Sequence, residues 1–509
     1  MDSDEKTSTV LAARSRHVDE ALAYLESHHE EAVVDDAMLR KIRRKIDWHI
    51  FPCVCACHMV QNLDKYALNY AAVMGLRNDL NLQGNDFSNV ATLFFVAYIV
   101  AEIPNIYLLQ RLPAAKWFGF NVFIWGIATA CTAATTDYAS LLAVRILLGI
   151  FEATTMPSSQ TITAQWFTKT EAPHRYAYWY FGNAGAQIVG GLASFGFQHV
   201  EHASLRGWRL MFLVFGVITV VIGIATALFV PDTPMEAKFL SEAEKVALIK
   251  HVSVNRTGIR NHRFRPQEIW EAARDPQIVI FLLPSKPFTL TQSQLASSSG
   301  IITTYSATLI KNMGYTSKQA ALLNMPGGLV SLTIVFAAAA AIRNTPGGHR
   351  WFWISACALL ASLGAALTSF LPPSPSHKPG LLVGIWLINA ITPTLPLMYH
   401  YASVNVSGHT KRSFAANAIA VGFGLGNIVG PQMFRAQDAP VYRGAKIGTL
   451  GTEAGTAVCV CVLAFWYRWE NGRRGRVTEN EAEDRREESG NEGWEGLTDW
   501  EDRGWRYCY

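Results

Sequence analysis

Twelve apolar runs of about twenty residues each organise this 509-residue sequence, which is 50% hydrophobic and only 17% charged. A run of that length matches the ~30 Å hydrocarbon core of a bilayer. Backbone polar groups in lipid must be satisfied within their own segment, so each run is predicted to form a helix. The runs cover residues 49–73, 87–110, 117–136, 138–160, 176–198, 208–230, 276–310, 322–342, 351–371, 380–402, 413–434 and 446–467. We therefore predict an all-α membrane protein with twelve transmembrane helices.

Lysines and arginines in the short flanks of these runs predict the orientation. One side of the bundle holds roughly twice as many of them as the other, beginning with the cluster at residues 40–45. The positive-inside rule then places both termini in the cytosol, and we expect the plasma membrane. Residues 1–47 contain no apolar signal region, so they are predicted to be a cytosolic tail without a cleavable signal peptide. The formal net charge of +4 reflects this bias and does not indicate a nucleic-acid partner.

The cysteines do not predict a metal site. The stretch "FPCVCACH" places Cys53, Cys55, Cys57 and His58 close together. On a helix, Cys53 and Cys57 share a face while Cys55 points away, so the set does not converge on one ion. No cofactor loop and no arrangement of nucleophile and base occurs in the sequence, so we expect neither a cofactor nor a metal, and no enzyme activity.

A polar stretch, residues 231–275, separates the first six runs from the last six. It is predicted to be a cytosolic loop between a first bundle, residues 48–230, and a second bundle, residues 276–468. The tail that follows, residues 469–509, mixes both charges and is predicted to be disordered. Small residues recur every four positions at Gly182, Ala186 and Gly190 in the fifth run and at Gly422, Gly426 and Gly430 in the eleventh. Either the six-helix unit is duplicated into two pseudo-symmetric bundles, or the triplets reflect only the glycine content typical of membrane helices.

The seventh run is irregular. Residues 276–310 exceed the length that a span needs, and the middle, "PSKPFTLTQSQLASSSG", carries two prolines, a lysine and two glutamines. A continuous lipid-facing helix does not tolerate such a segment. Either the helix is broken and lines a cavity, or a short segment at about 284–296 has been inserted. We favour the insertion, with residues 296–310 as the original body of the helix.

Ionisable residues within the runs are few, and most lie in the first half. They are Asp64, Lys65, Glu102, Arg145 and Glu152. Each costs roughly 2.5–3.5 kcal/mol near the centre of a membrane helix, and such residues mark functional sites by default. We expect Glu102 to act as a latch between helices.

Arg145 and Glu152 lie seven residues apart, so they share one stripe of a helix with about 10 Å of rise between them. By depth, Lys65 and Arg145 are predicted in the outer half of the membrane and Glu152 near the middle. Two cations with a carboxylate beneath them could receive an anion and a proton. The competing interpretation is structural, with Arg145 paired to Asp64 or Glu152 only to cancel charge.

The fourth helix of the second half carries no comparable charge. It reads "GIWLINAITPTLP" and contains Asn389 and Thr392. Coupling is therefore expected in the first half, while the second half contributes shape and neutral hydrogen bonds. The candidates for those bonds are Tyr305, Asn389, Asn417 and Asn427, although polar residues in bundles often only join helices.

Several stretches together resemble one family. "RILLGIFEATTMP", "YLLQRLP", "LNYAAVMGL", "GWRLMFLVFGVITVVIGIATALFVPDTP", "LIKNMGYTSKQAALLNMPGG" and the terminal "LTDWEDRGWRY" look like the fungal allantoate permease group. This group belongs to the anion:cation symporters of the major facilitator superfamily. The resemblance implies two six-helix bundles around a central site that opens alternately to each side. It also implies small organic anions taken up with protons, including ureido acids such as allantoate and carboxylate vitamins such as nicotinate, pantothenate and biotin.

The resemblance also implies roles for the buried charges. In related sugar-acid symporters, an Asp-Arg pair on the first helix and an arginine and a glutamate on the fourth serve substrate and proton. Asp64 and Lys65 match the pair, and Arg145 and Glu152 match the fourth helix. We therefore assign substrate binding to Lys65, Arg145, Tyr305, Asn389 and Asn417, and proton coupling to Asp64 and Glu152. Lys65 departs from the pattern, because a lysine lacks the planar fork that grips a carboxylate with two hydrogen bonds.

The sequence thus predicts a monomeric, proton-coupled importer of a small organic anion. Its partners would be the substrate, protons and the lipid bilayer. One alternative is an exporter of drugs or secondary metabolites by proton antiport, which would show a more neutral, aromatic cavity. A second alternative is a non-transporting nutrient receptor, which would need a long structured cytosolic domain.

Overall fold

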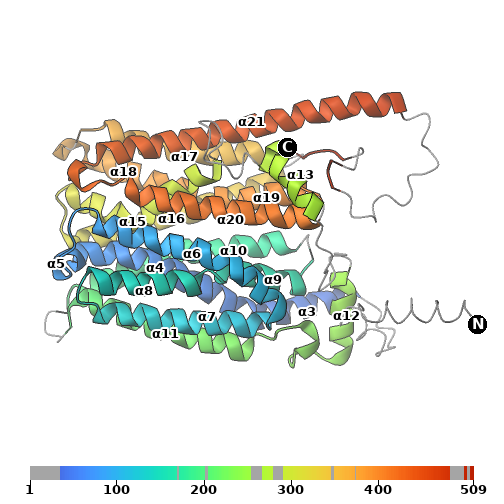
Figure 1. Ribbon diagram of the computed structural model, residues 1–509, viewed down its shortest axis with the longest axis horizontal. Helices are drawn as coiled ribbons and strands as arrows, with labels where there is room; N and C mark the ends of the chain where they lie inside the picture. The colour runs from blue at the N-terminus through green and yellow to red at the C-terminus, as the bar shows by residue number, and fades with distance from the viewer. Residues whose placement is uncertain are drawn as a thin grey trace, which may run out of the picture.

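The computed structural model describes residues 35–168, 171–200, 205–253, 266–278, 291–345, 349–372, 374–407, 409–481, 498–500 and 505–508. Within these residues the regular structure is helical throughout, as predicted. The long helices run side by side along the longest axis of the molecule (Figure 1). Three short helices identify its ends. The "α3 end" carries α3 (Asp36–His49) and α12 (Glu242–Ser253), and the "α5 end" carries α5 (Leu76–Asp79).

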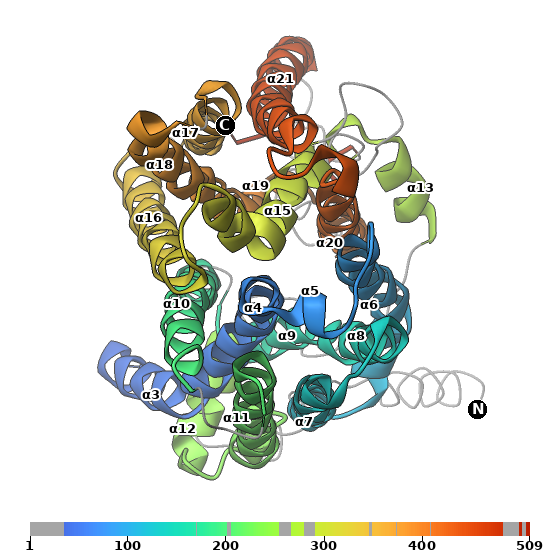
Figure 2. The ribbon, with the colours of Figure 1, turned by 90° about the vertical axis from the view of Figure 1, so that its left-hand side faces the viewer.

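Each predicted span falls on a helix or on a pair of consecutive helices. The first half contains α4 (Phe51–Met74), α6 (Asp86–Arg111), α7 (Ala114–Cys131), α8 (Tyr138–Glu152), α9 (Thr155–Trp166), α10 (Ala172–Phe197) and α11 (Gly207–Phe229). The second half contains α15 (Thr291–Asn312), α16 (Ser317–Asn344), α17 (Arg350–Phe370), α18 (Lys378–Ile388), α19 (Thr394–Asn405), α20 (His409–Gln432) and α21 (Arg443–Glu481). The view along the helices shows the halves as two groups that meet where α10 lies beside α16 and α6 beside α20 (Figure 2).

Eight segments of the described chain are long and apolar enough to cross a membrane by length and composition. They are Asp86–Leu109, Ala114–Ala134, Tyr138–Thr163, Gly207–Phe229, Ser317–Ile342, Arg350–Phe370, Pro375–Ala402 and Arg443–Arg474. Large apolar side chains such as Leu228, Ile103 and Phe229 are exposed, as expected where a helix faces lipid. The other four long helices, α4, α10, α15 and α20, carry many of the polar side chains described below.

Local sequence explains where several helices begin and approach one another. Asp137 caps α8, accepting a hydrogen bond from the Ser140 backbone N–H at 2.8 Å. Gly75 ends α4 with a φ of 111°, which favours glycine. On α10, a Cβ at Gly182 would lie 3.0 Å from the backbone nitrogen of Met59, and one at Gly190 would lie 2.9 Å from the Tyr70 ring. Two of the predicted small residues therefore let α4 and α10 pack closely.

Two sequence predictions need adjustment. The helix of the seventh span, α15, begins at Thr291 rather than near 296, so residues 291–296 of the suspected insertion are helical. Residues 279–290 lie outside the described part, and the insertion stays a prediction. The C-terminal tail is only partly as predicted, because α21 continues to Glu481 and residues 498–500 and 505–508 pack against the second half. Buried Thr498, Asp499 and Tyr507 explain this difference, because each has a polar partner outside these tail segments. Thr498 donates to Glu271, Asp499 accepts from Gln277, and the Tyr507 backbone N–H donates to Asn471.

Candidate functional site

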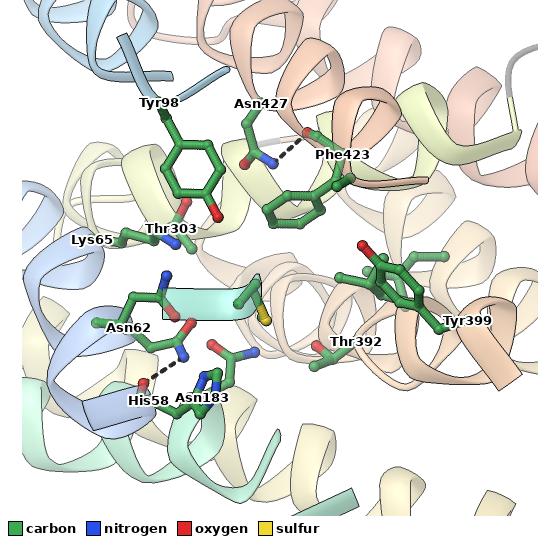
Figure 3. Close-up of a pocket in the computed structure, with 15 residues that line it drawn as sticks. His58, Asn62, Lys65, Tyr98, Asn183, Thr303, Thr392, Tyr399, Phe423 and Asn427 are labelled. Atoms are coloured by element: carbon green, nitrogen blue, oxygen red, sulfur yellow. Dashed lines mark hydrogen bonds between the residues drawn. The ribbon is translucent and has the colours of Figure 1, made fainter. Parts of the chain in front are cut away.

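A pocket of about 970 Å³, including the space at its mouth, lies between the two halves (Figure 3). Both halves contribute to its wall, and amide, hydroxyl and aromatic side chains predominate. Lys65 is the only lysine, arginine, aspartate or glutamate among the described residues that line it. The wall consists of His58, Gln61, Asn62, Lys65, Tyr98, Met156, Asn183, Thr303, Ile391, Thr392, Leu395, Tyr399, Ala420, Phe423 and Asn427.

Helix α4 supplies the polar stripe of the first half. His58, Gln61, Asn62 and Lys65 recur every three or four residues, so they lie on one face of the helix. Asn62 donates a hydrogen bond to the His58 carbonyl at 2.8 Å (Figure 3). The pocket is therefore lined over two turns of α4, with Lys65 nearest the α5 end.

Two broken helices face each other across the pocket. α8 ends at Glu152 and α9 begins at Thr155, while α18 ends at Ile388 and α19 begins at Thr394 after a short 3-10 turn. Residues next to both breaks line the pocket, namely Met156 in the first half and Ile391 and Thr392 in the second. Discontinuous helices at corresponding positions of two repeats are typical of the binding sites of secondary transporters.

Beside the pocket, four of the five ionisable residues predicted within the spans form two ion pairs. The Lys65 ammonium lies 2.9 Å from Glu152 Oε1, and Arg145 Nη1 lies 3.1 Å from Asp64 Oδ2. The Lys65 side chain is 13% exposed and that of Glu152 is 0% exposed. We call these four residues the "ion quartet". Arg145 and Glu152 lie on one stripe of α8, as their spacing predicted, and the structure shows that this stripe faces α4. The formal charges of the quartet sum to zero.

The two pairs differ in their access to the pocket. Of the four residues of the ion quartet, only Lys65 belongs to the pocket wall. The Arg145 guanidinium lies 5.5 Å from the Phe212 ring, and its Nε and Nη2 have no hydrogen-bond partner among the described residues. Asp64 also accepts a hydrogen bond from Thr129 at 3.4 Å. The structure thus shows the charge-cancelling pair of Arg145 with Asp64 that the sequence left as an alternative.

The candidate residues of the second half are spread over three places. Tyr305 is buried toward the α5 end, where its hydroxyl lies 2.6 Å from that of Ser88 and its ring stacks on Phe434. Asn389 is buried at the break after α18 and donates to the Ile385 carbonyl. Neither residue lines the pocket. Asn417 lies in α20 with its side chain outside the described part, whereas Asn427 does line the pocket and donates to the Phe423 carbonyl (Figure 3).

Hydrogen bonds between the halves close the pocket toward the α5 end. Asn69 of α4 donates to Ser306 of α15 at 2.8 Å, and Gln187 of α10 donates to the Asn324 carbonyl of α16 at 2.9 Å. Gln432 of α20 donates to Thr92 of α6 at 2.9 Å. Five of these six helices, α4, α6, α10, α15 and α20, also contribute residues farther from the α5 end to the pocket wall. The described pocket therefore has its polar seal on the α5 side.

Several site residues were not predicted from the sequence, chiefly His58, Asn62, Asn183 and Tyr399. One signal for them was present, because prolines interrupt the fourth run of each half, at Pro157 and at Pro393. Such paired interruptions indicate where a binding site lies. Glu102 was predicted to act as a latch between helices. Its Oε2 is buried and has no hydrogen-bond partner in the described part of the chain, so the latch stays a prediction.

Two six-helix halves around a central polar pocket, with broken helices and buried ion pairs beside it, are typical of membrane transporters. The chain belongs to the Major Facilitator Superfamily, whose family model matches residues 54–431. This result confirms the predicted fold. The matched family is one of transporters, as predicted, and not one of enzymes.

Relatives in yeast confirm the predicted group. The chain is 34% identical to the thiamine pathway transporter THI73 of Saccharomyces cerevisiae, over 92% of this chain and 86% of that protein. It is 31% identical to the allantoate permease of the same organism, over 98% of this chain and 93% of that protein.

Solved structures support the fold alone. The xylose transporter XylE from E. coli, in a partially occluded inward-open conformation, matches with a TM-score of 0.60 and 16% identity, over 83% of this chain and 97% of that chain. A bacterial homologue of the human lysosomal transporter Spinster, inward-facing and unoccupied, matches with a TM-score of 0.57 and 15% identity, over 81% of this chain and 95% of that chain.

Proposed function

We propose that this transporter imports a small organic anion together with protons by alternating access. The observation that carries the proposal is the position of Lys65, which lines the pocket and at the same time pairs with buried Glu152 at 2.9 Å. An ammonium facing the pocket attracts a carboxylate, while a carboxylate behind it accepts a proton. The substrate carboxylate and the Glu152 carboxylate thus compete for the Lys65 ammonium, so binding of the anion favours protonation of Glu152.

The coupling follows from the cost of buried charge. When a substrate carboxylate reaches Lys65, the ammonium lies between two negative groups, and the site acquires excess negative charge in a medium of low dielectric constant. Protonation of Glu152 removes that excess. The loaded carrier therefore reorients only after Glu152 has taken up a proton, and release of the proton on the other side restores the Lys65–Glu152 pair.

The remaining assignments extend this scheme. Arg145 is proposed as a second contact for the same substrate carboxylate, and Asp64 as a second site for the same transported proton, in states in which their pair opens. Tyr305, Asn389 and Asn417 are proposed to contact substrate from the second half as the halves move. Asn62, Asn183 and Asn427 present amide groups to the pocket, which suits the ureido, amide or ring nitrogen groups of allantoate-like acids and carboxylate vitamins.

The orientation of the chain in the membrane determines which side the pocket faces in the described state. The lysine and arginine distribution favours cytosolic termini, so we propose that the α3 end faces the cytosol and the α5 end faces the outside, with the carrier in the plasma membrane. The polar seal between the halves then lies on the outer side of the pocket. In this orientation the described state faces inward, where the substrate and proton are released. We expect a monomer to perform the cycle.

Uptake by a yeast strain lacking its own permeases, expressing this chain, tests the proposal. Labelled allantoate, nicotinate, pantothenate and biotin are supplied at two external pH values, and one of them is expected to accumulate more at the lower pH. Glu152→Gln should abolish accumulation and retain exchange of labelled for unlabelled substrate. Glu102→Gln, which removes a buried carboxylate away from the quartet, is the matched control and should still accumulate. Accumulation by Glu152→Gln would refute the proton role of Glu152.

A further inference from the structure

We infer that one proton accompanies one monoanionic substrate, so that the transport cycle moves no net charge. This inference rests on the proposed function and adds the stoichiometry and the charge class of the substrate. It comes from the pairing of the ion quartet and from the fact that one pair reaches the pocket and the other does not.

The charge count begins with the empty site. Lys65 and Arg145 contribute two positive charges, and Asp64 and Glu152 contribute two negative charges. The side chains of Arg145 and Asp64 are 2% and 3% exposed, so water does not screen their interaction well. The empty quartet is therefore neutral and suited to crossing between the two states of the carrier.

The other titratable groups of the pocket need no charge. Ser159 donates its hydroxyl to the Thr155 carbonyl at 2.8 Å, so His58 donates to Ser159 through Nε2–H at 3.0 Å. A neutral imidazole makes that bond with one of its nitrogens. Tyr98 and Tyr399 are phenols, which are neutral near pH 7. Lys65 is thus the only cation that the wall of the described pocket offers to a substrate.

A substrate with one carboxylate fits this arrangement. Its carboxylate takes Lys65 from Glu152, and a single proton on Glu152 returns the loaded site to neutrality. A second substrate carboxylate would find no cation in the pocket wall, because Arg145 lies outside the wall and is held by Asp64. A dianion would leave the loaded site with one uncompensated negative charge, and an uncompensated charge within the membrane is energetically unfavourable.

Accumulation by the purified full-length chain in proteoliposomes tests this stoichiometry. The substrate used is whichever of the four labelled acids accumulates in the yeast assay. Potassium gradients with valinomycin set the membrane potential, and internal and external buffers set the pH gradient. The ratio of internal to external substrate is read after uptake has stopped. With one proton and one negative charge, this ratio rises about tenfold per unit of pH gradient and does not change with membrane potential.

Other outcomes separate the two proposals. A ratio that rises about a hundredfold per pH unit, or that changes with potential, would overturn the one-to-one stoichiometry and would favour a second proton on Asp64 with Arg145 as a second anion contact. Proton-driven uptake itself would stand in that case. If no pH gradient drives any of the four acids, while counterflow shows that the reconstituted chain is active, the proposed coupling fails and this inference fails with it.

Discussion

The two halves bury charged groups in contrasting ways. In the first half, two cations and two carboxylates form separate pairs within the spans, at 2.9 and 3.1 Å. In the second half, one lysine at the α3 end, Lys411, contacts three carboxylates at 2.7 to 2.8 Å: Glu271 and Asp275 near α13 (Pro266–Arg274) and Asp499 of the C-terminal tail. We call these four residues the "Lys411 cluster".

This contrast indicates two different roles: the ion quartet can exchange a carboxylate for a ligand, whereas the Lys411 cluster anchors the C-terminal tail. The ion quartet is neutral and has one member, Lys65, on the pocket wall, so a ligand can replace one of its carboxylates. Lys411 is 0% exposed, and Asp275 and Asp499 are equally buried. Gln277 donates to both of these aspartates. Tyr507 donates its hydroxyl to the Asp499 carboxylate, and Arg474 donates to the Asp499 backbone carbonyl. The Lys411 cluster therefore fastens the tail to the second bundle.

Removal of the lysine should produce the largest effect on stability. Lys411→Met leaves three carboxylates without their shared cation, and breaking a buried ion pair from one side costs about 3–5 kcal/mol. We expect a loss of this size in the free energy of unfolding, measured by denaturant titration of the purified chain in detergent. Lys238→Met, at an exposed lysine, is the control and should change it by less than about 0.5 kcal/mol. Equal stability of the two variants would contradict the anchoring role.

The Arg145–Asp64 pair should show a smaller but measurable coupling. Arg145→Met leaves Asp64 buried without its partner, and Asp64→Asn leaves the guanidinium in the same position. The double variant removes both charges, so its stability loss should fall short of the sum of the single losses by about 0.5–3 kcal/mol. The measurement is a double-mutant cycle on the free energy of unfolding. Additive losses would show that the pair contributes no mutual stabilisation.

A change that keeps the charge of the quartet should have a still smaller effect. Lys65→Arg restores the planar fork that binds a carboxylate with two hydrogen bonds. We expect the KM of the accumulated acid to change by at most about tenfold, or about 1.4 kcal/mol, while accumulation still follows the pH gradient. Lys65→Met, which removes the cation from the pocket wall, should lose accumulation. If both variants transport equally, the pocket does not need a cation at this position.

The sequence was sufficient to predict the helices and the residues of the quartet. Length and hydrophobicity located each span, and the seven-residue spacing placed Arg145 and Glu152 on one stripe. The pairing was not predictable, because it depends on the rotation of α4 against α8. Adjacent residues of α4 point in different directions, and only the packed structure shows that Lys65 meets Glu152 while Asp64 meets Arg145.

Long-range contacts explain the remaining differences. The pocket wall combines residues from both halves, so no local pattern joins Asn62 to Thr392. The tail looked disordered because its charges are mixed and its apolar content is low. Its docking depends on Lys411 and Asn405, which are distant in sequence, and on Tyr467, whose ring stacks on that of Tyr507. Composition describes a segment alone and does not include a partner elsewhere in the chain.

The smallest expected effect is a pH dependence confined to the Lys411 cluster. Burial raises the pKa of Asp275 above its ordinary value, and the neighbouring Asp499 carboxylate raises it further against the opposing effect of Lys411. The docked tail therefore favours the protonated form of Asp275. The contribution of the protonated Asp275 carboxyl group to the free energy of unfolding is complete below the ordinary aspartate pKa. This contribution is lost as the pH rises through the raised pKa of Asp275. Thermal midpoints of the purified chain, measured from pH 4 to 7, should decrease with pH across this window by more than those of Asp275→Asn. Parallel profiles for the two proteins would mean that Asp275 does not hold a proton in the docked state, and the cluster would then anchor the tail through all three ionised carboxylates.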